Sequence, residues 1–443
     1  MVRFTIIGAL ALIMSSAALA ESRLQLSAPD SVMRGDPLSI RVDGLAPGEP
    51  VEITVERAAL GREPGLMRAR AVFHADDEGR LDTARSPAVS GAYVGVDETG
   101  LFRSLTRVAD APAPDLRPGE FLISALSGEG EHQAATRMTL LDAGSDVSAT
   151  AVHDLPGAAL YRIEDGQSYP LIIVLGGSEG GLFHALEIAP ALASRGYAAL
   201  ALPYYAPAWV GPDAFPGLPD SFVNIPVELL ELARDAAAAL PGVDADRVGV
   251  WGASKGAEFA LLGCSKFPWI TATAAMMASD VVWEGWGPAA QGPGQSASFA
   301  WRGEPLEFVP YEGADAYFGA FERGEWPTVT LASVHAGGRA AHPERAERAR
   351  IRVEACEGEV LAVGGGADLI WPSGDMAARV AQNRAEAGRE TITLIDGEAG
   401  HGLAGPGFVP TGDDPAANGP MQTAGWRAAL AMFERQLKDA PTP

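Results

Sequence analysis

The chain has 443 residues, of which 47% are hydrophobic and 20% charged, and its formal net charge is −24. This length exceeds that of one ordinary domain, so two are expected, and the composition is typical of a soluble globular protein with sizeable cores. The acidic balance provides no basic field for nucleic acid, which is therefore excluded as a partner, and it indicates mainly a well-solvated surface.

Residues 1–20 differ from the rest of the chain. An uncharged apolar stretch follows Arg3, and residues 18–20 have the sequence Ala-Leu-Ala. This pattern predicts a secretory signal that is cleaved after Ala20, so that the mature chain starts at Glu21. The apolar stretch is short for a membrane span, which makes an uncleaved anchor the weaker alternative. No other window is apolar and long enough to cross a bilayer, so we expect a periplasmic or secreted protein without a stable membrane span.

The region 24–142 predicts β-strands. Apolar and polar residues alternate in the runs PLSIRVDGL and PVEITVERA, which places one face of each strand on a core and the other in water. Clusters of Gly, Pro, Asp and Ser separate such runs at intervals that suit short strands joined by turns. We therefore expect a β-sandwich domain over residues 21–147.

The pattern changes in the second part of the chain. Continuous apolar runs such as PLIIVL (170–175) indicate strands that are buried on both faces, and VELLELARDAAAAL (227–240) has helical spacing. Strands that alternate with helices predict a parallel sheet covered on both faces, so residues 148–443 are assigned to an α/β domain. The segment 284–350 is rich in Gly, Pro and Trp and is expected to form an insertion over one end of the sheet.

A serine between two glycines follows one of these buried runs. The sequence GASKG, with Ser254 at its centre, comes directly after RVGVW and precedes a helical pattern. A tight strand-to-helix turn needs small flanking residues and pushes its serine out at the carboxyl end of the sheet. The helix amino terminus adds unpaired N–H groups and a positive dipole end, which suit a developing oxyanion. In this setting Ser254 is predicted to be a nucleophile rather than an ordinary turn residue.

A serine hydroxyl needs a base at neutral pH, and in this architecture an acid and then a histidine follow the serine along the chain. His401 lies in the loop DGEAGHGLAG, after the last strand, and is predicted to be the general base. Asp368 follows the strand VLAVGG and is the favoured acid that orients the imidazole. Asp375 and Asp396 are the alternatives for the acid.

An oxyanion hole requires two N–H donors. One is expected from the backbone of Lys255, the residue after the nucleophile. The other is expected from Gly177 or Ser178 in the loop GGSEGG, which follows the strand LIIVL. The same glycines also suit a plain turn, whereas a phosphate-binding loop is disfavoured because its GK[ST] ending is missing.

The two cysteines and the remaining histidines carry little chemistry. Export permits a disulfide between Cys264 and Cys356, but we favour two buried free thiols. The other histidines have no metal-ligand spacing, so neither a metal nor a cofactor is predicted.

Several side chains near these motifs have two interpretations. The ammonium group of Lys255 either binds an anionic group or is solvated at the helix start. A set of aromatic residues either lines an acyl pocket or, more commonly, packs inside the insertion. These residues are Tyr204, Tyr205, Trp283, Trp286 and Trp301.

Nearly all of the mature chain resembles the family of acyl-CoA thioesterases and bile acid-CoA:amino acid N-acyltransferases. The stretch FHADDEGRLDTARSPAVSGAYVGVDETGLFRSL is similar to its amino-terminal domain, and GGLFHALEIAPALASRGYAALALPYY and GASKGAEFALLGCSKFPWITATAAM are similar to its hydrolase domain. The resemblance implies an α/β-hydrolase domain preceded by an Ig-like β-sandwich. GGGADLIWPS matches the family's acidic segment at Asp368, and AGH matches its histidine segment at His401. Serine rather than cysteine at position 254 implies transfer of the acyl group to water rather than to an amino acid.

The preferred hypothesis is a serine hydrolase that cleaves small-molecule acyl thioesters or esters through an acyl-enzyme. An acyltransferase that passes the acyl group to an amine or alcohol is the alternative from the same catalytic class. A non-catalytic envelope protein that binds through its sandwich is the third hypothesis, and the intact set Ser254, Asp368 and His401 argues against it. The sequence leaves the oligomeric state open.

Overall fold

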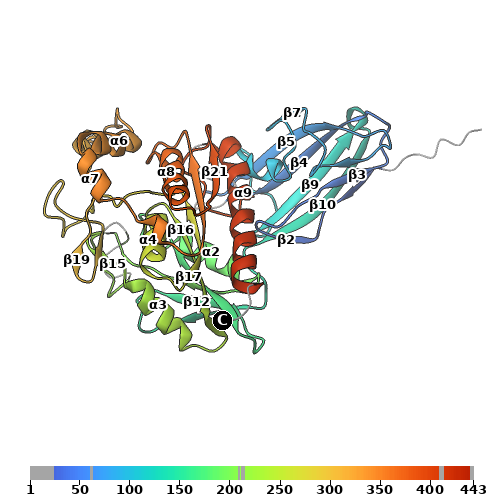
Figure 1. Cartoon of the computed structure of the whole chain (residues 1–443). Coiled ribbons are helices and arrows are strands. Elements are labelled where there is room, and N and C mark those ends of the chain that lie inside the picture. Colours follow the sequence, from blue (N-terminus) through green and yellow to red (C-terminus); the bar gives the residue numbers. More distant parts are fainter. Residues whose placement is uncertain (1–23, 60–62, 208–209, 211–214, 409–413, 440–443) are drawn as a thin grey trace, which may run out of the picture.

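The computed structural model describes residues 24–59, 63–207, 210, 215–408 and 414–439. The predicted secretory signal lies outside these residues. Figure 1 shows two parts side by side, a β-rich part at the amino-terminal end of the chain and a larger part of mixed helices and strands.

The amino-terminal part contains two sheets. The larger sheet has the strand order β2 (Ser31–Met33), β10 (His132–Leu141), β9 (Glu120–Ser127), β4 (Pro50–Ala58), β5 (Leu66–His74) and β7 (Ser90–Gly91), and β8 (Thr106–Val108) also pairs with β5. The smaller sheet has the order β1 (Gln25–Ser27), β3 (Arg41–Asp43) and β6 (Leu81–Asp82). Val42 from the smaller sheet and Ile53 from the larger one belong to the same buried cluster, so the two sheets pack as a sandwich.

The second part is built on one eight-stranded sheet. Its order is β11 (Val147–Ala151), β12 (Ala159–Ile163), β14 (Ala198–Ala201), β13 (Tyr169–Leu175), β16 (Val243–Ala253), β17 (Ile270–Met276), β20 (Glu359–Gly365) and β21 (Ile392–Asp396). The strands from β14 to β21 are parallel, and β12 pairs with its neighbours in the antiparallel sense. After β13 the chain adds β14 on one side and then β16 on the other side of β13, so the order in which strands are added reverses at β13. Such a reversal point at the carboxyl ends of the strands is where α/β sheets bind their ligands.

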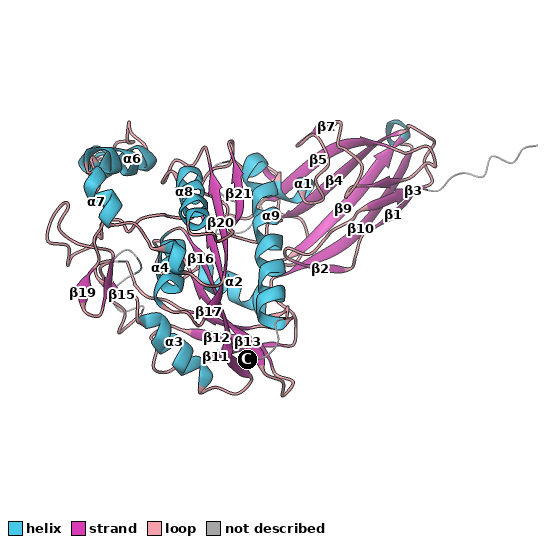
Figure 2. Cartoon of the chain, in the orientation of Figure 1, coloured by secondary structure: helices cyan, strands magenta, loops and turns pink. Residues whose placement is uncertain are grey.

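Helices cover both faces of this sheet, as the continuous apolar strands require (Figure 2). One face is covered by α3 (Leu229–Ala238), α4 (Lys255–Lys266) and α8 (Ser373–Glu386), and the other by α2 (His184–Ala193) and α9 (Pro415–Phe433). The predicted fold class is therefore confirmed: an α/β-hydrolase sheet follows a β-sandwich. The exact domain limits 21–147 and 148–443 stay predictions.

The long connection between β17 and β20 leaves the regular pattern of strand and helix. It holds β18 (Phe299–Trp301), β19 (Glu304–Pro305), α5 (Ala314–Glu322), α6 (Leu331–Ala341) and α7 (Pro343–Arg348). The strands β18 and β19 form a small separate sheet with β15 (Ile225–Pro226). We call this connection the cap, since its residues roof a cavity next to the end of β16.

The sandwich packs against α9 (Figure 1). Gly35 of the sandwich has a φ of +87° and lies so close to the indole of Trp426 that a Cβ at position 35 would be 2.3 Å from its Nε1. Arg427 of α9 forms an ion pair with Glu98. Phe408, from the loop that carries His401, packs in the sandwich core.

A disulfide joins Cys264 on α4 to Cys356, which lies shortly before β20. The interpretation of two free thiols is therefore wrong. The two residues are 92 positions apart, and only the packing of α4 against the segment before β20 brings them together.

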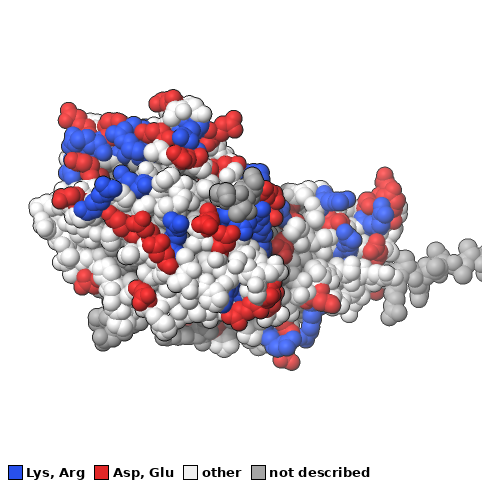
Figure 3. Space-filling view, turned by 60° about the horizontal axis from the view of Figure 1, so that its bottom comes forward, with Lys and Arg blue, Asp and Glu red and all other residues white. Residues whose placement is uncertain are grey.

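Acidic and basic side chains are interspersed on the face of the molecule in Figure 3. In the part of the chain that the structure describes, no helix is both long enough and apolar enough to cross a membrane.

Candidate active site

Ser254 occupies the sharp turn between β16 and α4. Its φ of 55° and ψ of −119° lie in a region that residues with a side chain rarely adopt, and such strain is typical of nucleophile turns. The flanking glycines are required sterically. A Cβ at Gly252 would be 2.1 Å from the carbonyl oxygen of Gly256, and a Cβ at Gly256 would be 2.1 Å from that of Gly176.

The structure brings the side chains of Ser254, His401 and Asp368 into one hydrogen-bonded line. His401 Nε2 lies 3.0 Å from Ser254 Oγ, and His401 Nδ1 lies 2.8 Å from Asp368 Oδ2. An ionised carboxylate only accepts hydrogen bonds, so Nδ1 carries the proton and Nε2 is free to accept the one from the serine hydroxyl. This is the arrangement in which a histidine acts as the general base for a serine.

The carboxylate of Asp368 is completely buried and fully hydrogen-bonded. Its Oδ1 accepts hydrogen bonds from the backbone N–H groups of Ile370 and Trp371, at 2.9 and 3.2 Å, and its Oδ2 accepts one from the hydroxyl of Ser373 at 2.6 Å. The alternative acids lie elsewhere: Asp375 is exposed in the first turn of α8, and Asp396 accepts hydrogen bonds from the loop backbone after β21.

The loop that contains Gly177 and Ser178 passes directly beside the nucleophile. A Cβ at Gly177 would be 3.3 Å from Ser254 Cβ, and Ser178 lines the space next to Ser254. The buried hydroxyl of Tyr204 lies 2.7 Å from the carbonyl oxygens of both Gly176 and Gly177 and donates to them. In a trans peptide the next N–H points away from the preceding carbonyl, so Tyr204 fixes the direction of the N–H groups of Gly177 and Ser178.

The side chain of Lys255 is buried and only 3% exposed, so the interpretation of a solvated lysine is wrong. Its Nζ lies 2.6 Å from Glu258 Oε2 and 2.9 Å from Ser298 Oγ. Burial lowers the pKa of Lys255, against the opposing effect of Glu258. Its charge is therefore compensated inside the protein by Glu258.

An apolar cavity of about 650 Å³ opens beside Ser254 under the cap. Its large lining side chains are Tyr205, Trp286, Tyr311, Phe318, Leu331 and Trp371. Of the aromatic residues singled out in the sequence, Tyr205 and Trp286 line this cavity. Trp283 is buried in the wall behind it, and Trp301 packs on Phe267.

A second cavity of about 370 Å³ also borders Ser254, and we call it the polar cavity because charged side chains line part of it. It shares Ser178, Ser254 and Ile370 with the apolar cavity and is also lined by His401. Its charged lining residues are Arg34, Glu179, His184 and Glu187. The sandwich therefore contributes a side chain, Arg34, to the surroundings of the nucleophile.

The charged groups of the polar cavity are paired with one another. Arg34 Nη2 lies 2.8 Å from Asp142, and its Nη1 contacts Glu187. His184 Nδ1 lies 3.4 Å from Glu179. This hydrogen bond raises the pKa of His184 despite burial. Burial pushes the pKa of Glu179 up, but the hydrogen bond and charge of His184 outweigh it and hold that pKa below its usual value.

Sequence reasoning missed His335 of α6, which lines the apolar cavity. Burial, chiefly, lowers its pKa to about 4, so the ring is neutral at physiological pH. Its Nδ1 donates to the carbonyl of Leu331 at 2.8 Å, and its ring contacts Trp283 and Trp371 edge-on. A lone histidine in an irregular insertion gives no signal in the sequence, because only the cap's packing places it.

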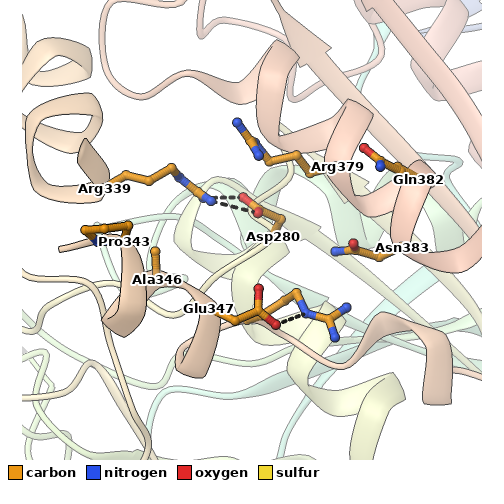
Figure 4. Close-up of a pocket in the computed structure, with 9 residues that line it drawn as sticks. Asp280, Arg339, Pro343, Ala346, Glu347, Arg379, Gln382 and Asn383 are labelled. Atoms are coloured by element: carbon orange, nitrogen blue, oxygen red, sulfur yellow. Dashed lines mark hydrogen bonds and ion pairs between the residues drawn. The ribbon is translucent and has the colours of Figure 1, made fainter. Parts of the chain in front are cut away.

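An arginine-rich pocket of about 310 Å³ lies between the cap and α8 (Figure 4). Both terminal nitrogens of Arg339 bond the buried carboxylate of Asp280, while Arg379 lines the pocket from α8. No residue of this pocket lines either cavity beside Ser254. Among the residues that the structure describes, no three His, Cys, Asp or Glu side chains are grouped to hold a metal ion.

Two family models match this chain. The one described as the acyl-CoA thioester hydrolase/BAAT N-terminal region matches residues 35–126, and the one described as the BAAT/acyl-CoA thioester hydrolase C terminal matches residues 225–416. The chain belongs to the acyl-CoA thioester hydrolase/BAAT family. The first match falls on the sandwich, and the second spans the turn at Ser254, Asp368 and His401.

Curated relatives in the acyl-CoA thioester hydrolase/BAAT family are about one-third identical to the chain. Acyl-coenzyme A thioesterase 1 of Rattus norvegicus is 32% identical over 273 residues, which cover 57% of this chain and 59% of the relative. The mitochondrial acyl-coenzyme A thioesterase 2 of the same organism is 32% identical over 258 residues, 54% of this chain and 52% of the relative. The chain thus spans a little more than half the length of these relatives.

Two solved structures are similar to part of this chain. A putative dienelactone hydrolase from Klebsiella pneumoniae has a TM-score of 0.41 and 15% identity, and the match covers 65% of this chain and 98% of that chain. An esterase from Pyrobaculum calidifontis has a TM-score of 0.40 and 14% identity, with 66% and 87% covered.

Proposed function

We propose that this protein is a serine hydrolase that cleaves acyl thioesters or esters through an acyl-enzyme on Ser254. The observation that carries the proposal is the distance of 3.0 Å between Ser254 Oγ and His401 Nε2, with Asp368 behind the imidazole. Membership of a family whose named relatives are acyl-coenzyme A thioesterases supports acyl transfer as the reaction class.

In the acylation half, Ser254 Oγ attacks the acyl carbonyl while His401 Nε2 takes the hydroxyl proton. Asp368 stabilises the resulting imidazolium through Nδ1–H. The negative charge on the carbonyl oxygen is stabilised by the N–H of Lys255 at the start of α4 and by the N–H of Ser178 or Gly177. The tetrahedral intermediate then collapses, and His401 returns the proton to the departing thiol or alcohol.

In the deacylation half, a water molecule takes the place of the leaving group. His401 removes a proton from the water as it attacks the acyl-enzyme. His401 then gives this proton to Ser254 Oγ as the acid product leaves. The acyl chain occupies the apolar cavity under the cap throughout, since burial in an apolar site is favourable for hydrocarbon and the cavity opens directly beside Ser254.

The test is hydrolysis of a decanoyl ester by the wild type and by Ser254→Ala. We expect the variant to lose at least about 10³-fold in kcat. An alkyl fluorophosphonate should add one label to Ser254 of the wild type. Ser265→Ala is the matched control, because Ser265 lies on the same helix and its hydroxyl only bonds the carbonyl of Leu262.

Two results would contradict the proposal. One is full turnover by Ser254→Ala. The other is formation of an amide in place of the free acid when an amine acceptor is added, which would favour the acyltransferase.

The proposal includes export through the segment 1–20. The disulfide between Cys264 and Cys356 supports it, because disulfides persist in oxidising compartments such as the periplasm or the extracellular space. Fractionation of cells and amino-terminal sequencing of the mature protein test this part, with Glu21 expected as the first residue.

A further inference from the structure

The charges around the nucleophile identify the kind of leaving group. We propose that the natural substrate has an uncharged or cationic leaving group without phosphate, so that coenzyme A is not the preferred carrier. This inference rests on the proposed hydrolase function, because it names the substrate of that same site.

The two cavities beside Ser254 suit the two parts of the substrate, the acyl chain and the leaving group. The apolar cavity is lined mainly by aromatic and aliphatic side chains, and it is the place for the acyl chain. The polar cavity also borders Ser254, and unlike the apolar cavity it is lined by His401, the group that protonates the leaving atom. The leaving group therefore departs through the polar cavity.

Among the residues that the structure describes, no cation that lines the polar cavity is left uncompensated for an anionic leaving group. The charge of Arg34 is shared between Asp142 and Glu187, and its Nε is buried away from solvent. His184 is paired with Glu179. Two carboxylates, Glu179 and Glu187, line the cavity beside Arg34 and His184. Asp142 is a third carboxylate, outside the lining, so the surroundings of the leaving group are neutral to acidic.

The apolar cavity would not serve a phosphate group either. Lys255 is paired with Glu258 within hydrogen-bond distance, and Glu284 adds a carboxylate to the lining. The chain as a whole carries a net charge of −24, which adds a repulsive field for any polyanion.

Coenzyme A carries several ionised phosphate groups, and proteins bind such groups with arginine, lysine or free helix N–H donors. The arginines of the pocket in Figure 4 line neither of the two cavities beside Ser254. Arg339 in that pocket is already bonded by both terminal nitrogens to Asp280. These arginines do not compensate for the missing cations beside Ser254.

Three thioesters with the same decanoyl chain test the inference, those of coenzyme A, N-acetylcysteamine and thiocholine. At low ionic strength we expect kcat/KM for the coenzyme A ester to be at least about tenfold below that for either small thioester. The gap should narrow as salt is added, because screening weakens the repulsion. A coenzyme A ester that is cleaved as fast as the N-acetylcysteamine ester, or faster, overturns the inference.

Two variants test whether the carboxylates beside Arg34 cause the low turnover of the coenzyme A ester. Glu187→Gln removes one of the two carboxylate charges that compensate Arg34 and should raise the ratio of coenzyme A to N-acetylcysteamine turnover about threefold or more. Glu231→Gln removes the same charge from the exposed face of α3 and should leave that ratio unchanged. A selective loss of coenzyme A turnover in Arg379→Gln would overturn the inference, since phosphates would then reach the arginine-rich pocket.

The experiment separates this inference from the proposed function. If no thioester is cleaved and Ser254 takes no fluorophosphonate label, the hydrolase proposal fails. If the coenzyme A ester is the best substrate, the hydrolase proposal holds and only the inference fails.

Discussion

The hydroxyl of Ser373 donates a hydrogen bond to Asp368 at Oδ2, the same carboxylate oxygen that His401 contacts. Ser373 is itself fully buried at the start of α8. Because α8 and the loop after β20 share this bond, the position of the carboxylate is set by the sheet and its covering helix rather than by the histidine alone. A preorganised carboxylate is what keeps an imidazole in one tautomer.

Replacing Asp368 with Asn tests that role. The amide cannot stabilise an imidazolium and favours the wrong tautomer, so kcat should fall by about 10⁴-fold while the fold is retained. Ester hydrolysis and circular dichroism measure the two effects. Asp375→Asn makes the same change on the exposed first turn of α8 and should leave kcat as it is. A small loss in Asp368→Asn would assign the acid to another residue.

Replacing Tyr204 with Phe removes the hydroxyl that holds the carbonyls of Gly176 and Gly177. The loop's N–H donors then lose their fixed direction, and we expect kcat to fall by about 10- to 100-fold with KM little changed, somewhat less than the loss of a whole oxyanion donor. The carbonyl of Gly176 loses this partner, whereas that of Gly177 keeps the N–H of Gly180, and the unpaired carbonyl should cost about 1–3 kcal/mol of stability. Tyr197→Phe, at a buried tyrosine near Glu434, is the control for lost stability without lost kcat. Equal kinetics in both variants would count against the positioning role.

Breaking the disulfide should destabilise the α/β part strongly. In the chain-entropy picture, a loop of the length that Cys264 and Cys356 close contributes about 4–5 kcal/mol. The double variant Cys264→Ala, Cys356→Ala should therefore unfold at a clearly lower temperature in calorimetry. The wild type heated with a reductant should approach the same transition. Identical melting with and without reductant would show that the bond does not form.

The pH dependence of substrate preference should follow His184. Its pKa is raised by Glu179, so the imidazolium is present below its ordinary value of 6.5 and is lost as the pH rises through the higher pKa of the folded state. The polar cavity then becomes more negative, and the ratio of coenzyme A to N-acetylcysteamine turnover should fall.

The variant His184→Gln should flatten this pH dependence, whereas His74→Gln, at an exposed histidine of the sandwich, should preserve it. The ion pair also contributes stability that is present below pH 6.5 and is lost as the pH rises through the raised pKa. A ratio that stays constant with pH in the wild type would contradict the link to His184.

Local sequence patterns predict a large part of this fold and site. The turn at Ser254 is encoded by glycines two positions away, whose absent Cβ atoms leave room for the backbone of Gly256 and Gly176. The strands and the loops after them are short-range features, so the positions of Asp368 and His401 at one sheet edge follow from the α/β pattern.

The sequence does not predict features that depend on packing between distant parts of the chain. The disulfide requires α4 to lie beside the segment before β20, and the burial of Lys255 requires Glu258 and the cap to surround it. Tyr204 and Tyr205 are adjacent in sequence but have different fates, since Tyr204 bonds the glycine loop and Tyr205 lines the apolar cavity. The alternation of side chains along an extended segment does not show which residues each side chain will contact in the folded protein.

The ring of Phe408 lies in the sandwich core beside Phe102, a few residues beyond His401 on the same loop. Deleting the amino-terminal sheets would expose the ring of Phe408 to solvent. It would also remove the contact that holds the loop of His401 at its carboxyl-terminal end. The two parts are consequently not interchangeable modules. Any chimera that keeps the hydrolase sheet must also provide an apolar site in which the ring of Phe408 can pack.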